Sequence, residues 1–329
     1  MTVATTSAEC DELLAEAERF HPLYGDRLAS HLPMALVAMD RMGATPAQLR
    51  RFFDAYAAKL RPRDAPAPPA DPLPLLGAGE GFEGLFAFFR EAARADGVEA
   101  VLRRWVPILA PGLAASAFHA MIRLAYALEA RRGPEICQAL AFWAMAYQPI
   151  PLSTARAPGS PEAIAAALSR VVAGHRYAPG IIVDRMLELA RHPALAHAAI
   201  QPEALELADV AGFALGAYAR TEGFTLLHTV TACHAFRVVA PYLGDPEPAT
   251  RWLWQAVLTA FLTTGPAPAP EAPAGDPGDE RDWGRCRERA VETLDDHVIK
   301  LTYTAWQESR VRPDARYLFV ARRKTSPAA

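Results

Sequence analysis

Apolar residues recur along most of the chain at intervals of three and four residues, the period of an amphipathic helix. Ala, Leu, Arg and Glu, which favour helices, fill these segments, and alternating β-branched runs are nearly absent. The pattern predicts a succession of helices, over residues 9–19, 25–42, 46–60, 82–95, 97–104, 112–131, 134–147, 161–173, 180–191, 203–219, 222–240, 247–263 and 280–309. We therefore expect an all-α fold, a large helical bundle.

Proline and glycine mark the ends of these segments. Thr45 places a capping side chain before Pro46, which suits the first position of a helix. Two stretches rich in Pro, Ala and Gly, near 61–80 and 265–279, predict irregular loops. No clear change in composition flanks either stretch, so we expect residues 1–329 to form a single domain.

Composition and charge exclude several classes of protein. The chain has 329 residues, of which 51% are hydrophobic, enough for a sizeable core. Its 34 basic and 37 acidic residues give a net charge of −3, which provides no basic field for nucleic acid or a membrane surface. No apolar run approaches the roughly 18–20 residues that cross a bilayer, and the acidic N-terminus lacks the apolar segment of a signal peptide. We expect a cytoplasmic protein that binds neither nucleic acid nor membrane.

Four of the nine histidines lie inside strongly apolar helical patterns on separate predicted helices: His31, His119, His228 and His297. A single buried histidine is more often a hydrogen-bonded core residue than a ligand. Helical bundles, however, build metal sites from inward side chains on facing helices, and imidazole is the commonest ligand for iron, copper and zinc. The pattern leaves both interpretations open. His234 follows His228 by six residues, so it points away from that helix face and we leave it out of the site.

Two of these histidines have polar companions at helical spacing. Lys300 is three residues beyond His297 and shares its helix face. A lysine on a buried stripe is costly unless it is paired, neutral or modified. Thr231 is likewise three residues beyond His228, where its hydroxyl would be able to orient or support the imidazole.

The common catalytic motifs are missing, so further catalytic candidates are sought near the four histidines, and two lie on the helix of His119. The chain has no GxSxG, P-loop, GxGxxG or HExxH motif, which leaves nucleotide, flavin and zinc-protease sites without support. Arg123 and Tyr126 follow His119 at four and seven residues and form a polar line with it. That line would either face a substrate or form an ordinary buried network.

Several short motifs are spread over most of the chain, from about residue 20 to about residue 320. In chain order they are His21-Pro-Leu-Tyr24, His31-Leu-Pro-Met-Ala-Leu, Met42-Gly-Ala-Thr45, Phe118-His-Ala-Met-Ile-Arg-Leu-Ala-Tyr126, Leu227-His-Thr-Val-Thr231, Asp296-His-Val-Ile-Lys300 and Pro313-Asp-Ala-Arg-Tyr317. Each motif is short, but their order and spread together are specific. In this respect the chain resembles the questin oxidase-like family.

The resemblance implies an oxygenase that uses molecular oxygen on a polycyclic aromatic substrate, an anthraquinone or polyketide-like compound. The reaction would be oxidative C–C cleavage or Baeyer–Villiger-type oxygen insertion. The resemblance also implies a non-haem iron, Fe(II), with ligands His31, His119, His228, His297 and a carboxylated Lys300. A carbamate would turn a costly buried cation into an anionic ligand. We expect apolar and aromatic neighbours to line the pocket: Phe118, Met34, Met121, Phe224, Tyr303 and Trp306.

Two other functions stay open on the sequence alone. One is a metal-free, NADPH-dependent Baeyer–Villiger oxygenase, although no nucleotide motif supports it. The other is a non-enzymatic helical carrier of a small molecule, in which the histidines are hydrogen-bonded core residues. The sequence does not determine the substrate, the bond that is cleaved, a need for an external reductant, or the oligomeric state.

Overall fold

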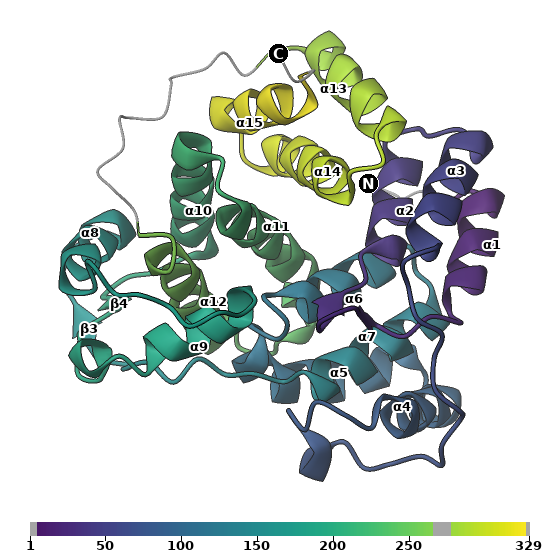
Figure 1. Ribbon diagram of the computed structural model, residues 1–329, viewed down its shortest axis with the longest axis horizontal. Coiled ribbons are helices and arrows are strands. Elements are labelled where there is room, and N and C mark those ends of the chain that lie inside the picture. The colour runs from purple at the N-terminus through teal and green to yellow at the C-terminus, as the bar shows by residue number, and fades with distance from the viewer. Residues whose placement is uncertain (1–4, 266–277, 327–329) are drawn as a thin grey trace.

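The computed structural model describes residues 5–265 and 278–326, and in these residues the chain is mostly helical (Figure 1). The helices are α1 (Ala8–Ala17), α2 (Leu32–Arg41), α3 (Pro46–Ala57), α4 (Phe82–Asp96), α5 (Val98–Leu109), α6 (His119–Glu129), α7 (Gly133–Met145), α8 (Pro161–Val171), α9 (Ile182–Ala190), α10 (Leu207–Thr221), α11 (Phe224–Val239), α12 (Pro246–Leu262), α13 (Glu280–Glu292), α14 (Asp296–Val311) and α15 (Ala315–Thr325). The predicted all-α class is confirmed.

Short strands form two small pairs. Strand β1 (Leu23–Tyr24) pairs antiparallel with β2 (Leu28–Ala29) in a hairpin that leads into α2. Strand β3 (Arg156–Ala157) pairs in parallel with β4 (Gln201–Pro202). None of the helices in the described part of the chain is long and apolar enough to cross a membrane.

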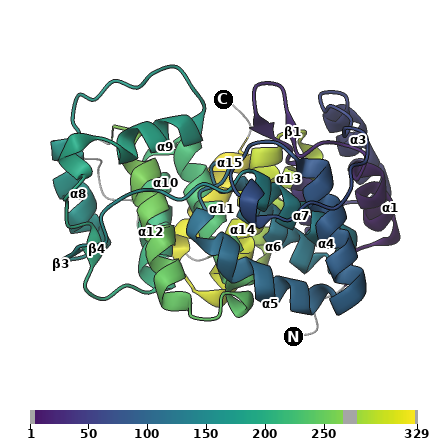
Figure 2. The ribbon, with the colours of Figure 1, turned by 90° about the horizontal axis from the view of Figure 1, so that it is seen from below.

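Four helices form the centre of the molecule. Helix α2 packs on α6, α6 on α11, α11 on α14, and α14 on α2, so the contacts close into a ring. Helices α6 and α11 are buried nearly all round, as expected for helices that are apolar on every face. Figure 2 shows α6, α11 and α14 in the middle, with α8, α9 and α12 on one side and α1, α3 and α4 on the other.

Local sequence explains where several helices begin. The Thr45 hydroxyl accepts a hydrogen bond from the backbone N–H of Gln48, and Pro46 is the first residue of α3, as predicted. The side chain of Asp295 accepts hydrogen bonds from the first turn of α14. Each cap satisfies backbone donors that have no partner within the helix, and thereby fixes the entry point of the chain.

Several predicted helices were wrong in extent, and three of them differ most from the structure. The predicted helix 25–42 begins only at Leu32, because the preceding residues form the β1–β2 hairpin. The predicted helix 112–131 begins at His119, because three consecutive residues, Ser116 to Phe118, have positive φ angles that a right-handed helix excludes. The predicted helix 280–309 is two helices, since Thr293 has an extended backbone and Asp295 caps a new start.

The other predictions concern the two irregular loops and the last helix. Residues 61–80 are irregular apart from a single 3-10 turn at Leu73–Leu75, as predicted. The second predicted loop, 265–279, lies almost entirely outside the described residues. Helix α15 was not predicted, although the apolar face that it buries against α14 contains Tyr317, Leu318 and Val320.

Candidate metal centre

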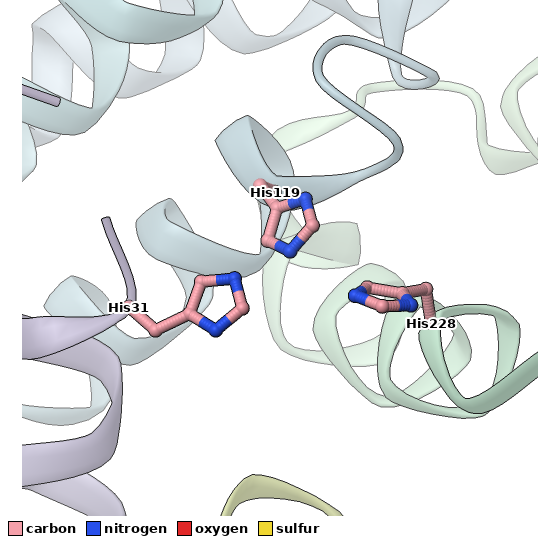
Figure 3. A group of neighbouring side chains, drawn as sticks. All are labelled: His31, His119 and His228. Carbon is pink, nitrogen blue, oxygen red and sulfur yellow. The ribbon is translucent and has the colours of Figure 1, made fainter. Parts of the chain in front are cut away.

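All four histidines singled out from the sequence meet at one end of the central helices. His31 immediately precedes α2, His119 is the first residue of α6, His228 lies one turn into α11, and His297 lies in the first turn of α14. The N-terminal ends of all four helices therefore converge on one point. Figure 3 shows His31, His119 and His228 directed toward one another from three different segments.

The distances between the rings are short. Ring centroids are 4.5 Å apart for His31 and His119, 4.8 Å for His119 and His228, 4.8 Å for His31 and His297, and 5.3 Å for His228 and His297. Potential ligand atoms of His31, His119 and His228 lie within 4.8 Å of one another, and so do those of His31, Asp296 and His297. Two ligands bonded at about 2.1 Å to one ion lie roughly 3–4 Å apart. Small side-chain rotations would therefore bring these groups onto a common ion.

Hydrogen bonds hold the rings with one nitrogen turned inward. The Nδ1 atoms are engaged by neighbouring groups: in His31 by the Asp296 carboxylate, in His119 by the Ser116 carbonyl oxygen, and in His228 by the Phe224 carbonyl oxygen, 2.9 Å away. The Nε2 atoms of His119 and His297 are buried and have no hydrogen-bond partner among the described residues. Metal-binding histidines show this arrangement, in which the outer ring nitrogen is held and the inner one is left free.

Burial keeps the four imidazoles neutral. It is the largest cause that lowers the pKa of His31, His119 and His228 well below the usual value, and the neighbouring rings and Lys300 lower it further. Burial and Lys300 also lower the pKa of His297 to about 4. The neutral imidazole is the form that binds a metal, so no proton has to leave these rings at pH 7.

Two charged groups, Asp296 and Lys300, complete the cluster. Burial raises the pKa of Asp296, but its hydrogen bond with His31 and the charge of Lys300 outweigh this and hold that pKa well below its usual range. Burial lowers the pKa of Lys300 to about 8, although Asp296 opposes the shift. The Lys300 Nζ atom is buried and has no hydrogen-bond partner among the described residues. Asp296 is therefore an anionic candidate ligand, and Lys300 is an amine that is easily neutralised.

The four helix N-termini give this point a positive potential. Each helix end carries roughly half a positive charge, which favours anions and opposes cations. Like burial, this positive potential disfavours the protonated forms of Lys300 and of the histidines. A metal ion held here would need anionic ligands to offset the field, and Asp296 is the only carboxylate in the two chelating groups of the described residues.

A cavity of about 420 Å³ opens beside the histidines, and His31, His119, His228 and His297 form part of its wall. Most of the remaining wall comes from the β1–β2 hairpin, the start of α9 and the start of α11, and it is largely apolar: Tyr24, Leu28, Ala29, Ile181, Ile182, Val183 and Phe224. The ion pair between Arg27 and Asp184, 2.7 Å long, ties the hairpin to α9. Phe224 is 60% exposed, so an apolar surface remains open next to the imidazoles.

The structure places the other predicted site residues away from this cavity. Arg123 is buried in an ion pair with Glu135, and its Nε lies 2.6 Å from Oε1. This contact agrees with the second interpretation of Arg123, that of a buried network. The Thr231 hydroxyl donates to the carbonyl oxygen of its own helix at His228, 3.1 Å away, while the Phe224 carbonyl orients that imidazole instead. Neither Arg123 nor Thr231, nor Tyr126, is among the residues that line the cavity. A catalytic role for these three residues stays a prediction.

Of the expected pocket-lining residues, only Phe224 lines the cavity beside the histidines. Phe118, Met34 and Met121 are buried in the core, and Tyr303 and Trp306 line a different cavity. Sequence analysis missed Asp296 as a partner of the histidines, although it directly precedes His297 in the chain. It also missed the lining residues of the hairpin, because that segment was predicted as helix.

His234 lies outside the centre, as its position six residues beyond His228 predicted. Its Nδ1 is 2.7 Å from Glu308 Oε1, and its Nε2 is 3.3 Å from Glu129 Oε1. Burial lowers the pKa of His234, but the two carboxylates outweigh burial and raise that pKa to about 9. Glu308 also pairs with Arg237, so the group is a buried ion-pair network.

This network predicts how stability depends on pH. The pKa of His234 rises from 6.5 to about 9 on folding. Its contribution to the unfolding free energy is therefore fully present below about pH 6.5 and is lost as the pH rises through 9. The contribution is about 3 kcal/mol at most. We expect the difference in unfolding free energy between the wild-type protein and a His234→Gln variant to shrink by that order between pH 6.5 and 9.5, measured by urea denaturation. A difference that stays constant over this range would show that His234 is not charged in the folded protein.

Comparison with known proteins gives one match to a family. The model of the family described as questin oxidase-like matches residues 28–305 of this chain. The matched part contains all four clustered histidines, Asp296 and Lys300. A search of curated proteins gave no match.

Proposed function

Because the chain belongs to the questin oxidase-like family, we propose that it is a non-haem iron-dependent oxygenase of polycyclic aromatic compounds. The observation that carries the proposal is the set of four neutral imidazoles at the wall of an apolar cavity, two of which, His119 and His297, have a buried Nε2 without a partner among the described residues. Orphaned buried nitrogens are costly, and an ion between them would satisfy them together. The substrate would be an anthraquinone or another polyketide-like compound.

The residues present fit a single iron ion. His31, His119, His228 and His297 would supply nitrogen ligands, and Asp296 would orient His31 through its hydrogen bond. A ferrous ion held by imidazoles, with a coordination position left open, supplies the activation of molecular oxygen. The neutral state of the rings and the nearby carboxylate favour the ion against the positive potential of the helix ends.

The cavity itself would position the substrate and exclude water. Its walls at Tyr24, Ile182 and Phe224 are flat or branched apolar groups that suit a fused aromatic ring system. At the mouth, Arg27 and Arg185 are able to contact the phenolic oxygens of such a substrate. Because the apolar walls displace water, the substrate would be held against the imidazole cluster in a dry site.

Lys300 is proposed to carry a carbamate. Burial favours its neutral amine, which is the form that reacts with carbon dioxide. The amine nitrogen bonds to the carbon of CO₂ and releases one proton, so the side chain becomes an anionic oxygen ligand. This modification would remove the buried unpartnered ammonium and would offset the positive field at the helix ends.

The Lys300→Met variant tests this role. In buffer freed of carbon dioxide, where Lys300 carries no carbamate, we expect the variant to raise the unfolding free energy of the iron-free protein by about 3 kcal/mol at pH 7. The depressed pKa of Lys300, about 8 instead of 10.5, reports the cost of burying its charge. Affinity for ferrous iron should fall at least about tenfold, because one anionic group is lost. The measurements are urea denaturation and anaerobic iron titration, with the exposed Lys59→Met as a control.

Carbon NMR gives an independent check of the modification. With ¹³C-labelled bicarbonate, the wild-type protein should show a carbamate signal that is missing in Lys300→Met. If the variant binds iron as tightly as the wild-type protein and the wild-type protein shows no carbamate signal, Lys300 is not a ligand.

Oxygen uptake tests the proposed reaction. Protein loaded anaerobically with ferrous iron is mixed with a hydroxyanthraquinone in aerated buffer, and oxygen consumption and product mass are followed. The proposal expects substrate-dependent oxygen uptake that requires iron. Equal uptake by iron-free protein with NADPH would instead favour a metal-free Baeyer–Villiger oxygenase, and binding of the quinone without uptake in either case would favour a carrier.

A further inference from the structure

A second cavity, of about 770 Å³, lies at the opposite end of the four central helices. Its wall includes Arg41 and Glu129, the last residues of α2 and α6, and Arg237 and Arg310 near the ends of α11 and α14. Along α14, thirteen residues separate His297 from Arg310, which corresponds to about 20 Å at 1.5 Å per residue. We call it the C-terminal cavity, because it is bounded by helix C-termini and is separate from the histidine cluster.

The side chains that line the C-terminal cavity are strongly basic. They include four arginines, Arg41, Arg131, Arg237 and Arg310, and one acid, Glu129. The charge of Glu129 is already balanced on its inner side, because one carboxylate oxygen lies 3.3 Å from His234 Nε2 and the other accepts a hydrogen bond from the Tyr303 hydroxyl at 3.0 Å.

Two of the four arginines bind other groups of the protein. Arg41 donates a 2.7 Å hydrogen bond to the carbonyl oxygen of Glu129 at the end of α6. Arg237 pairs with the buried Glu308 at 2.7 Å. The four helix C-termini contribute roughly half a negative charge each, and arginines in this position offset them. Among the described residues, the side chains of Arg131 and Arg310 have no such hydrogen bond or ion pair, so these two remain available to a ligand.

Arg131 and Arg310 are exposed and line the same cavity. Within residues 5–265 and 278–326, neither of them forms an ion pair with a carboxylate. The guanidinium of Arg310 lies 5.3 Å from the ring centroid of Trp306, and it therefore extends along the aromatic part of the wall. Two unpaired guanidinium groups at one cavity form a site for a carboxylate, sulfonate or phosphate, to which arginine binds through paired N–H donors.

The remaining wall is aromatic and aliphatic. Tyr242, Tyr303 and Trp306 supply ring surface, and Leu128 and Val238 supply aliphatic surface. Such a wall favours a flat ligand, since aromatic rings pack face to edge or offset against one another. The cavity thus combines an apolar, ring-lined part with a cationic part.

We propose that the C-terminal cavity is a binding site for a planar aromatic anion, whose ring contacts Trp306 and Tyr303 and whose acidic group pairs with Arg131 and Arg310. The ligand class is an aromatic ring that bears a carboxylate, sulfonate or phosphate. The site uses none of the clustered histidines and needs no metal. A test of this site is therefore independent of the oxygenase proposal.

Isothermal titration calorimetry with naphthalene-2-carboxylate tests the site, with neutral naphthalene-2-carboxamide as the matched ligand. We expect the carboxylate to bind at least about tenfold more tightly than the carboxamide, because only the carboxylate makes charge-assisted hydrogen bonds. The double variant Arg131→Ala/Arg310→Ala should lose that preference and bind both ligands equally. Both side chains are exposed, so the variant should fold, and circular dichroism checks this.

Two further variants identify the cavity that is occupied. Arg94→Ala removes an exposed arginine from α4 that is not among the lining residues, and it should leave binding unchanged. Arg185→Ala removes an arginine from the cavity beside the histidines and should leave the preference for the carboxylate over the carboxamide unchanged. The proposal is overturned if naphthalene-2-carboxylate does not bind, if the double variant keeps the preference for the carboxylate, or if Arg185→Ala abolishes it instead.

Discussion

Replacement of His228 by alanine is expected to lower the affinity for ferrous iron by at least about 100-fold while the protein stays folded. His228 lies between His119 and His297 in the cluster, with ring centroids 4.8 Å and 5.3 Å away, so its loss opens one side of the proposed centre. Loss of a residue that only supports a metal ligand already costs 10–100-fold in affinity, and a ligand should cost more. The measurement is an anaerobic titration followed by elemental analysis.

A matched histidine variant separates a specific loss from a general one. His197 is exposed, so His197→Ala should bind iron like the wild-type protein. Iron-free His228→Ala should unfold at a denaturant concentration similar to that of iron-free wild-type protein, because the imidazole contributes a single hydrogen bond to the Phe224 carbonyl. If His228→Ala retains wild-type iron affinity, the clustered histidines do not form the iron site.

The Arg123→Met variant is expected to lose about 3–5 kcal/mol of unfolding free energy. Arg123 and Glu135 are 3% and 2% exposed, and the guanidinium makes hydrogen bonds of 2.6 and 3.1 Å with the carboxylate. Removal of the arginine leaves a buried carboxylate without a counter-charge, which costs far more than the pair itself contributes. Urea denaturation at pH 7 measures the loss.

A double variant provides the control for this effect. Arg123→Met combined with Glu135→Leu removes both charges, so it should recover most of the lost stability. The same variants decide between the two interpretations of Arg123 in the sequence. If Arg123→Met is as stable as the wild-type protein but has lost oxygen uptake, Arg123 acts in the reaction rather than in a buried network.

The sequence predicted the fold class and most helices because their apolar period is local information. It did not predict the start of α6, because the left-handed backbone at 116–118 depends on how this segment is packed and not on its composition. The hairpin before α2 was missed for a similar reason. Apolar residues at 28–32 fit a helical period equally well, and only the pairing of Leu23 with Ala29 shows that the segment is a strand.

The four histidines were recognisable as a set because each interrupts an apolar helical pattern. Periodicity shows that a side chain points inward, but it does not show at which end of a bundle it lies. Tyr303 and Trp306 share α14 with His297 and were therefore expected beside it. At 1.5 Å per residue they lie roughly 9–14 Å further along the helix, where they line the C-terminal cavity instead.

Asp296 shows a second limit of sequence analysis. Asp296 was part of a motif that the chain shares with its family, but the sequence analysis gave it no role in the site. Its carboxylate contacts His31, which belongs to a segment 265 residues earlier in the chain, and also lies 3.5 Å from His297 Nδ1. Such a contact depends on the packing of α14 against α2, and no local pattern reports it.

X-ray absorption spectroscopy of the protein loaded anaerobically with ferrous iron tests the four-histidine centre most directly. We expect one iron per chain, with four imidazole nitrogens at about 2.1 Å, and a loss of imidazole scattering in His228→Ala. Iron that is surrounded only by water or carboxylate oxygens, or that is removed by gel filtration, would contradict a metal centre at these histidines.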